Sequence, residues 1–203
     1  MIWIKRDIEC DLLICKNFKY GNPIVFLRNR KNWEEVNRTL RELQQMDADM
    51  LKKKPSAEKW SALECIDHLN QTYQIYIPNL ETAIGASSKN PQTKYKSGIF
   101  GDIMVSSVSL KSNGKAKMPM KTFDFFEPRV LDNLKKEEVF DRFFKFHEKF
   151  RDFIQDSKDL NINKIKVQSA LSWLKLRLGV CLLFLLNHEL RHIAQAKRAM
   201  NNS

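Results

Sequence analysis

The stretch "LKLRLGVCLLFLLNHELRHIAQAKRAM", residues 174–200, decides the fold class of this chain. Its first half is apolar all around a helix, and its second half is polar on the outer side. This pattern is typical of a helix whose first half is enclosed by neighbouring helices. We therefore predict a central helix over residues 174–200, with the other helices of the protein packed around it.

Three other segments show helical spacing. Residues 33–53 carry apolar side chains at steps of three and four, which predicts one amphipathic helix. A second helix begins at Ser61, where "SALE" forms a capping box, and ends at Gly85. A third covers residues 137–155, whose apolar seam is rich in phenylalanine. The apolar stripe of the first of these helices consists of Val36, Leu40, Leu43, Met46 and Met50.

Four long helices without a clearly alternating strand predict an all-α protein, a four-helix bundle. Only "PIVFL", residues 23–27, has the character of a strand. Residues 1–32 lie outside the bundle pattern, and we predict that they form an N-terminal extension of unknown role. The bundle domain then spans residues 33–203.

Residues 86–136 differ from the helical segments, because serine, asparagine, glycine and proline are spread along them. We predict a long irregular connection between the second and third long helices, with one short helix over residues 99–110. The segment "FDFFEPRV", residues 123–130, then brings aromatic side chains back to the bundle. Irregular connections of this length inside a compact domain are usually functional, so we expect this one to cover a functional opening.

The composition excludes several classes of protein. No window approaches the run of about 20 apolar residues that a membrane-spanning helix needs, and charges interrupt the apolar positions of residues 1–15. The four cysteines show neither a CxxC motif nor the density of a disulfide scaffold. We therefore expect a cytoplasmic protein without a membrane partner. The formal net charge of +11 comes without a recognition motif or strong clustering, so we do not expect nucleic acid as a partner.

His188 and His192 lie four residues apart, which on a helix places both imidazoles within reach of one metal ion. The spacing is equally compatible with two partly buried histidines that bond to backbone and water. "HELRH" also fits a zinc-protease signature, but no His, Asp or Glu follows His192, and Arg191 is charged where that signature normally is not. A third ligand must come from upstream. His68 and His147 are both candidates, and spacing does not decide between them.

Two motifs carry a resemblance to a known family. "KWSALECIDHL", residues 59–69, and "NHELRHIAQAKR", residues 187–198, resemble the DinB/YfiT-like superfamily of four-helix-bundle metalloproteins, of the DinB-2 type. Its members have Trp-Ser or Trp-Thr at the start of the second helix and a histidine seven or eight residues later. Their last helix carries HxxxH, often followed by Gln. The matching residues are Trp60, Ser61, His68, His188, His192 and Gln195.

The resemblance implies that His68, His188 and His192 hold one divalent metal ion, usually zinc or nickel, in a bundle that is frequently a homodimer. It also implies an enzyme that joins a low-molecular-weight thiol, such as bacillithiol or mycothiol, to an electrophile, or a metal-dependent hydrolase. Three neutral imidazoles leave the ion its full charge and an open position, which is typical of catalytic sites. A thiol or a water molecule there ionises nearer neutral pH.

Two residues near these ligands are candidate catalytic residues. Glu64 lies one turn before His68, and Gln195 lies one turn beyond His192, so each could orient an imidazole or a water molecule. The capping box alone also explains Glu64. We predict a metal-dependent transferase or hydrolase that acts on a small electrophilic molecule. The alternative is a non-catalytic helical binding or regulatory module with a structural or empty metal site.

Three charged residues are close to the histidines in the predicted last helix. Arg191 and Arg177 project near the histidine face, where each could receive a carboxylate of the substrate or remain a solvated charge. Glu189 points about 100° away from His188 on a helix, so we do not assign it as a general base.

Overall fold

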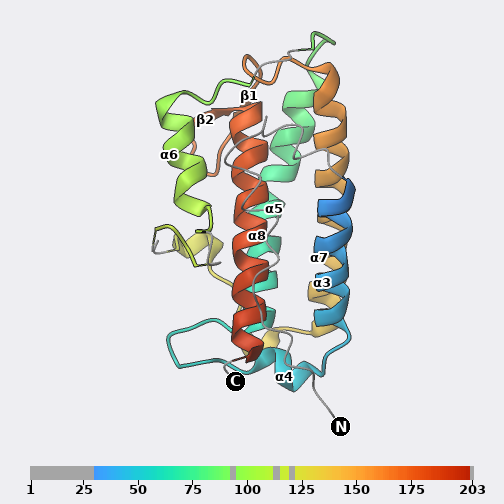
Figure 1. Ribbon diagram of the computed structural model, residues 1–203, viewed down its shortest axis with the longest axis vertical. Coiled ribbons are helices and arrows are strands. Elements are labelled where there is room, and N and C mark those ends of the chain that lie inside the picture. The colour runs from blue at the N-terminus through green and yellow to red at the C-terminus, as the bar shows by residue number, and fades with distance from the viewer. Residues whose placement is uncertain (1–29, 92–94, 112–114, 119–121, 202–203) are drawn as a thin grey trace.

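The computed structural model describes residues 30–91, 95–111, 115–118 and 122–201. Its long helices run along the longest axis of the molecule (Figure 1). α5 packs against α7 and α8, and α3 packs against the same two helices. The prediction of an all-α four-helix bundle is confirmed. These long helices are α3 (Arg30–Gln44), α5 (Ala62–Gly85), α7 (Lys136–Asp156) and α8 (Leu178–Asn201).

The first long helix is interrupted, which corrects the prediction of one helix over residues 33–53. A separate short helix, α4 (Ala48–Lys52), begins directly after Asp47, whose carboxylate accepts a hydrogen bond from a backbone amide of the new first turn. An aspartate in this position favours the start of a helix over the continuation of the previous one. The break also changes which side chains face inward. Leu51 is fully buried, whereas Met50, which was predicted in the apolar stripe, is 53% exposed.

α5 has the boundaries that its capping signals predict. The Ser61 hydroxyl accepts a hydrogen bond from the Glu64 amide at 3.2 Å, and the Glu64 carboxylate accepts one from the Ser61 amide at 2.7 Å. This reciprocal pair satisfies two amide groups that a helix start otherwise leaves without partners. The helix ends at Gly85, as expected.

A short hairpin precedes α8 and corrects the predicted start of that helix. β1 (Lys166–Gln168) pairs antiparallel with β2 (Lys175–Arg177), and Val167 lies opposite Leu176. Both of these side chains are buried, while their neighbours in the strands are more exposed. The leucines of this region alternate with Lys and Arg at the period of a strand, so α8 begins only after β2.

The connection between α5 and α7 is long and largely irregular, as predicted. The one α-helix in its described part, α6 (Gly98–Val108), packs against α8 on the outside of the bundle (Figure 1). The two helices approach closely at Gly101, where an added Cβ atom would lie 2.7 Å from a methyl carbon of Val180. Short 3-10 helices are found in the connection and after α7: η1 (Asp124–Phe126), η2 (Leu131–Asn133) and η3 (Ser157–Asp159).

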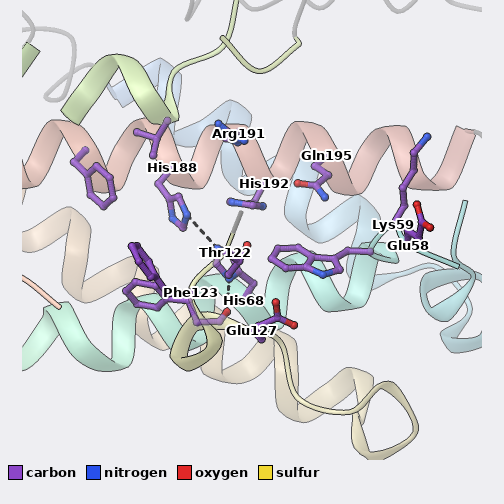
Figure 2. A pocket seen from close by; sticks show the side chains of 14 residues that line it. Glu58, Lys59, His68, Thr122, Phe123, Glu127, His188, Arg191, His192 and Gln195 are labelled. Atoms are coloured by element: carbon purple, nitrogen blue, oxygen red, sulfur yellow. Dashed lines mark hydrogen bonds between the residues drawn. The ribbon is translucent and has the colours of Figure 1, made fainter. Parts of the chain in front are cut away.

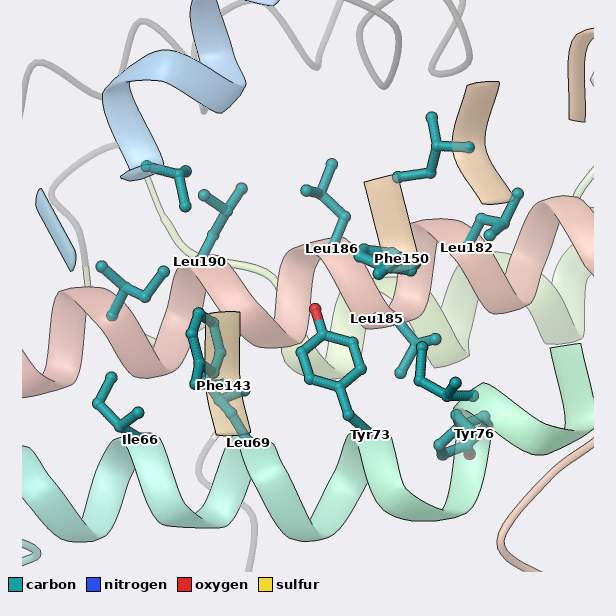
Figure 3. Close-up of a cluster of buried hydrophobic side chains, with 14 of the residues drawn as sticks. Ile66, Leu69, Tyr73, Tyr76, Phe143, Phe150, Leu182, Leu185, Leu186 and Leu190 are labelled. Atoms are coloured by element: carbon teal, nitrogen blue, oxygen red, sulfur yellow. The ribbon is translucent and has the colours of Figure 1, made fainter. Parts of the chain in front are cut away.

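The core lies between α5, α7 and α8 (Figure 3). Tyr73 of α5 packs against Phe143 and Phe150 of α7, with ring centroids 6.0 and 5.5 Å away. The first half of α8 is enclosed on nearly all sides, as its sequence predicts. Its buried apolar side chains there are Leu178, Val180, Cys181, Leu182, Leu183, Leu185 and Leu186.

Part of the predicted N-terminal extension, residues 1–29, lies outside the described residues, and so does the strand predicted at residues 23–27. Residues 30–32 belong to α3. The division into an extension over residues 1–32 and a bundle domain over residues 33–203 therefore stays a prediction. None of the helices in the described part of the chain is long and apolar enough to cross a membrane.

Candidate metal centre

His68 is oriented from two sides. The capping box on Ser61 sets where α5 begins, and His68 lies about two turns later. The ring nitrogen Nδ1 of His68 is hydrogen-bonded to the main-chain oxygen of Phe126 in η1. Because a carbonyl oxygen can only accept, Nδ1 carries the proton and donates, which leaves the lone pair on Nε2. Nε2 is therefore the nitrogen with which His68 can bind a metal ion.

His188 and His192 bring two further imidazoles to the same place from α8. Their ring centroids are 4.6 Å apart, and the His68 ring centroid lies 5.0 Å from that of His188 and 4.4 Å from that of His192. One potential ligand nitrogen from each ring lies within 4.8 Å of the other two. Figure 2 shows the three rings between α5 and α8. The structure thus brings together the three histidines that were predicted as metal ligands.

The spacing of the nitrogens fits a single metal ion. Nitrogen ligands of tetrahedral zinc lie about 2.0–2.1 Å from the ion and therefore about 3.3 Å from each other. The Nε2 atoms of His68 and His188 are 3.1 Å apart, and the potential ligand nitrogens of all three rings lie within 4.8 Å of one another. Nδ1 of His188 is buried without a hydrogen-bond partner among the described residues. Imidazole ligands suit zinc, nickel, iron and copper alike, so the donor set does not choose the metal.

Burial keeps all three imidazoles neutral. It lowers the pKa of His68 to about 4, although the hydrogen bond to Phe126 acts in the opposite direction. Burial also lowers the pKa values of His188 and His192 well below the usual 6.5, and positive charge on Arg191 adds to this effect. At neutral pH the lone pairs of the rings are therefore available to a cation.

The three rings open into a pocket of about 380 Å³ (Figure 2). One part of its wall is aromatic. The Trp60 ring lies 4.8 Å from the His68 ring and 5.7 Å from the His192 ring, measured between centroids. Such an apolar wall excludes water from one side of the imidazoles. The other aromatic residues that line the pocket are Phe123, Phe126 and Phe184.

The segment that contains Phe126 is fastened to α5 by an ion pair. Asp67 is fully buried, and the Arg129 guanidinium donates to its carboxylate from Nη2 at 2.7 Å and from Nε at 3.1 Å. The Arg129 amide donates to the same carboxylate at 2.9 Å. Residues 123–130 therefore return to the bundle, as predicted, although Phe123 is 52% exposed.

The two predicted catalytic residues lie in different surroundings. Both carboxylate oxygens of Glu64 have partners, the Ser61 amide at 2.7 Å and Lys54 Nζ at 3.0 Å, and Glu64 is not among the residues that line the pocket. Gln195 does line the pocket, and its interaction with His192 raises the pKa of that imidazole against the larger effect of burial. The catalytic roles of both residues stay predictions.

His147 does not join the other three histidines. Its Nδ1 lies 3.1 Å from the Glu189 carboxylate, which also accepts a hydrogen bond from the Tyr73 hydroxyl. All three side chains are buried between α5, α7 and α8. Glu189 thus faces the core and not the pocket, as its direction on the helix predicts.

Arg177 and Arg191 lie in different parts of the structure. Arg177, in β2, donates a hydrogen bond to the main-chain oxygen of Lys96 and is not part of the pocket wall. Arg191 lines the pocket beside the histidines. Of the two arginines, only Arg191 therefore lies where it could contact a substrate in the pocket.

The sequence did not indicate two parts of this site. A main-chain oxygen such as that of Phe126 has no signature in the side chains of the sequence. Asp67 and Arg129 are 62 positions apart, and nothing in a single sequence pairs them. The one available signal was the return of "FDFFEPRV" to the bundle, which places the segment near α5 without naming its contacts.

Comparison with known proteins agrees with this geometry. No curated protein and no solved structure matches the chain. A family profile described as DinB superfamily matches residues 30–196, which include α3, α5, α7, nearly all of α8 and the three clustered histidines. The match covers well over half of the sequence, and it confirms the resemblance that the two motifs indicated. The chain belongs to the DinB superfamily.

Proposed function

We propose that this protein is a divalent-metal-dependent enzyme that activates a low-molecular-weight thiol or a water molecule towards a small electrophilic substrate. The observation that carries the proposal is the cluster of His68, His188 and His192 in the wall of a pocket of about 380 Å³. A purely structural site has no need of such a space beside its ligands, whereas a catalytic site keeps a position open for substrate.

The protein residues would have distinct tasks. His68, His188 and His192 would hold the ion, with zinc and nickel as the proposed metals. A bound divalent ion supplies Lewis-acid activation of a thiol or a water molecule. Phe126 orients His68 through its main-chain oxygen, and Trp60 shields the imidazoles from water.

The predicted catalytic residues enter the proposal in two ways. Gln195 lies on the pocket wall beside His192, where its amide can orient that ring or a reacting molecule. For Glu64 the contacts with Ser61 and Lys54 support a positioning role, because they fix the first turn of α5 and with it the place of His68. The homodimer and the cytoplasmic location stay predictions.

Metal analysis of the purified protein and of single variants tests the proposal. We expect about one metal ion per chain in the wild type, and loss of most of it in His68→Ala, His188→Ala and His192→Ala. His147→Gln is the matched control, because it alters the only other histidine of the chain and should keep the metal. Retention of stoichiometric metal by all three alanine variants contradicts the proposal.

An activity assay separates the enzyme from a non-catalytic module. The wild type should accelerate the reaction of a small thiol with an activated aryl halide, or the hydrolysis of an activated ester, and His188→Ala should not. If the wild type binds metal and accelerates neither reaction, the site is that of a binding or regulatory module.

A further inference from the structure

Arg191 places a cation directly in the wall of the pocket. It lies on α8 between His188 and His192 in the sequence, and it lines the same pocket as those two histidines (Figure 2). The guanidinium is close enough to act electrostatically on His68 as well. The side chain is partly buried, so its charge is less screened by solvent than that of a surface arginine.

The guanidinium is held by one of its nitrogens. Nη1 donates to the main-chain oxygens of Ser107, at 3.0 Å, and Met118, at 3.1 Å. Nε and Nη2 have no hydrogen-bond partner in the part of the chain that the structure describes. These two nitrogens form one edge of the guanidinium, and two parallel N–H groups on such an edge match the two oxygens of a carboxylate.

Among the described residues, no carboxylate forms an ion pair with Arg191. Glu58 and Glu127 line the pocket but are exposed at its rim. The buried carboxylates of the adjoining turns have partners elsewhere: Asp67 has Arg129, Glu64 has Lys54 and Glu189 has Tyr73.

Another part of the pocket wall suits an apolar group. Trp60, Phe123, Phe126 and Phe184 contribute aromatic surface to the same cavity. A ligand that fills a cavity of about 380 Å³ can touch both the aromatic side chains and the guanidinium.

We infer that the substrate of this pocket is a small organic carboxylate with an apolar, preferably aromatic, group, and that the open edge of Arg191 binds its carboxylate in a bidentate manner. This inference rests on the proposed function, because it names the substrate class of the same site. Arg191 then fixes the orientation of the substrate, and the three histidines lie beside its reacting part.

Binding of two matched probes to the metal-loaded protein tests the inference. 3-Phenylpropanoate and 3-phenylpropanamide have nearly the same size and differ in charge. By calorimetry we expect the acid to bind the wild type about 10- to 100-fold more tightly than the amide, the range expected of hydrogen bonds to charged groups. Arg191→Gln should weaken binding of the acid to the level of the amide and leave the amide unchanged.

Two further variants serve as comparisons. Arg177→Gln is the matched control, because Arg177 is also partly buried and also donates to a main-chain oxygen, but lies outside the pocket wall. It should keep the preference for the acid. Arg191→Lys keeps the charge without the two-pronged edge, so it should retain only part of the preference.

Three results overturn the inference. These are equal binding of acid and amide to the wild type, absence of binding of the acid at millimolar concentration, and an unchanged preference for the acid in Arg191→Gln. The last result would assign the preference to the metal ion or to Lys59, which also lines the pocket. Metal content, measured in the same samples, tests the proposed function separately. If the purified protein holds no metal, but the wild type prefers the acid and Arg191→Gln does not, the result supports the inference and contradicts the metal-dependent enzyme.

Discussion

Nδ1 of His68 donates its hydrogen bond to the main-chain oxygen of Phe126. One member of the histidine cluster is therefore oriented by the connection between α5 and α7, and not by α8, the helix that carries the other two rings. The adjacent residue, Asp67, holds the same segment through Arg129. Asp67 and His68, two consecutive residues of α5, thus both contact the connection, so its conformation affects the geometry of the site.

Arg129→Ala should lower both stability and metal affinity. It leaves the fully buried Asp67 carboxylate without its cation, which we expect to cost about 3 kcal/mol in the free energy of unfolding. Without the ion pair, the segment that contains Phe126 should hold the His68 ring less firmly, which should weaken metal binding by about tenfold. Denaturant unfolding and competition with a chelator measure the two effects. Arg151→Ala, which breaks an exposed pair with Asp152, is the control and should change stability by about 0.5 kcal/mol or less. Equal effects of the two variants contradict the prediction.

Stability of the metal-free protein should fall as the pH falls below 6.5. The pKa of His68 is about 4 in the folded protein and 6.5 in the unfolded chain, so between these values only the unfolded chain binds the proton. Over this interval His68 alone should remove about 3 kcal/mol. Unfolding free energies at a series of pH values, with chelator present, measure the slope. In His68→Gln the slope should be smaller by about one proton, and an unchanged slope contradicts the assignment.

Removal of metal should lower the melting temperature of the wild type. A ligand at 1,000 times its dissociation constant stabilises the folded state by about 4 kcal/mol. Differential scanning calorimetry with and without chelator should therefore show a clear shift. His192→Ala should melt at the same temperature in both conditions, because it lacks one of the three rings. A shift of the same size in this variant places the metal elsewhere.

Glu64→Gln separates a positioning role from a chemical one. Glutamine keeps an acceptor for the Ser61 amide but removes the charge that faces Lys54. If Glu64 acts only through the capping box, activity should stay within about twofold of wild type, whereas Ser61→Ala should lower stability by about 1 kcal/mol. Steady-state rates and unfolding curves provide the measurements. Loss of activity in Glu64→Gln with unchanged stability gives Glu64 a chemical role.

Tyr73→Phe should destabilise the core without affecting the site. The change removes one of the two hydrogen-bond contacts of the buried Glu189 carboxylate and leaves only that of His147, and the loss of a hydrogen bond to a charged group costs about 2 kcal/mol. Metal content should remain that of the wild type, because neither residue lines the pocket. If Tyr73→Phe loses metal as well as stability, the core contact and the metal site are not independent, which contradicts the prediction.

The apolar periodicity of the sequence was sufficient to predict the bundle. Helix boundaries were predictable where a local signal exists, as at Ser61 and Gly85. They were wrong where two signals compete, as at Asp47, where the capping carboxylate interrupts an apolar stripe. The start of α8 was also wrong, because a hydrophobic run hid the shorter period of β2 before it.

The histidine cluster illustrates a different limit. The HxxxH spacing on one helix predicts that His188 and His192 meet, but it contains no information about a partner from another helix. His147 was the other candidate for the third ligand, and it is buried, but beside Glu189. The choice of His68 came from family resemblance. The polar contacts of the site join residues far apart in the chain, and only the folded structure reveals these.

Gly101 gives the outer helix an influence on the position of Arg191. Since a Cβ atom there would overlap Val180, even an alanine would push α6 away from α8. Ser107, later in α6, is one of the two anchors of the Arg191 guanidinium. The missing side chain of Gly101 therefore helps to determine where α6 holds the guanidinium of Arg191, the group that we propose binds the substrate.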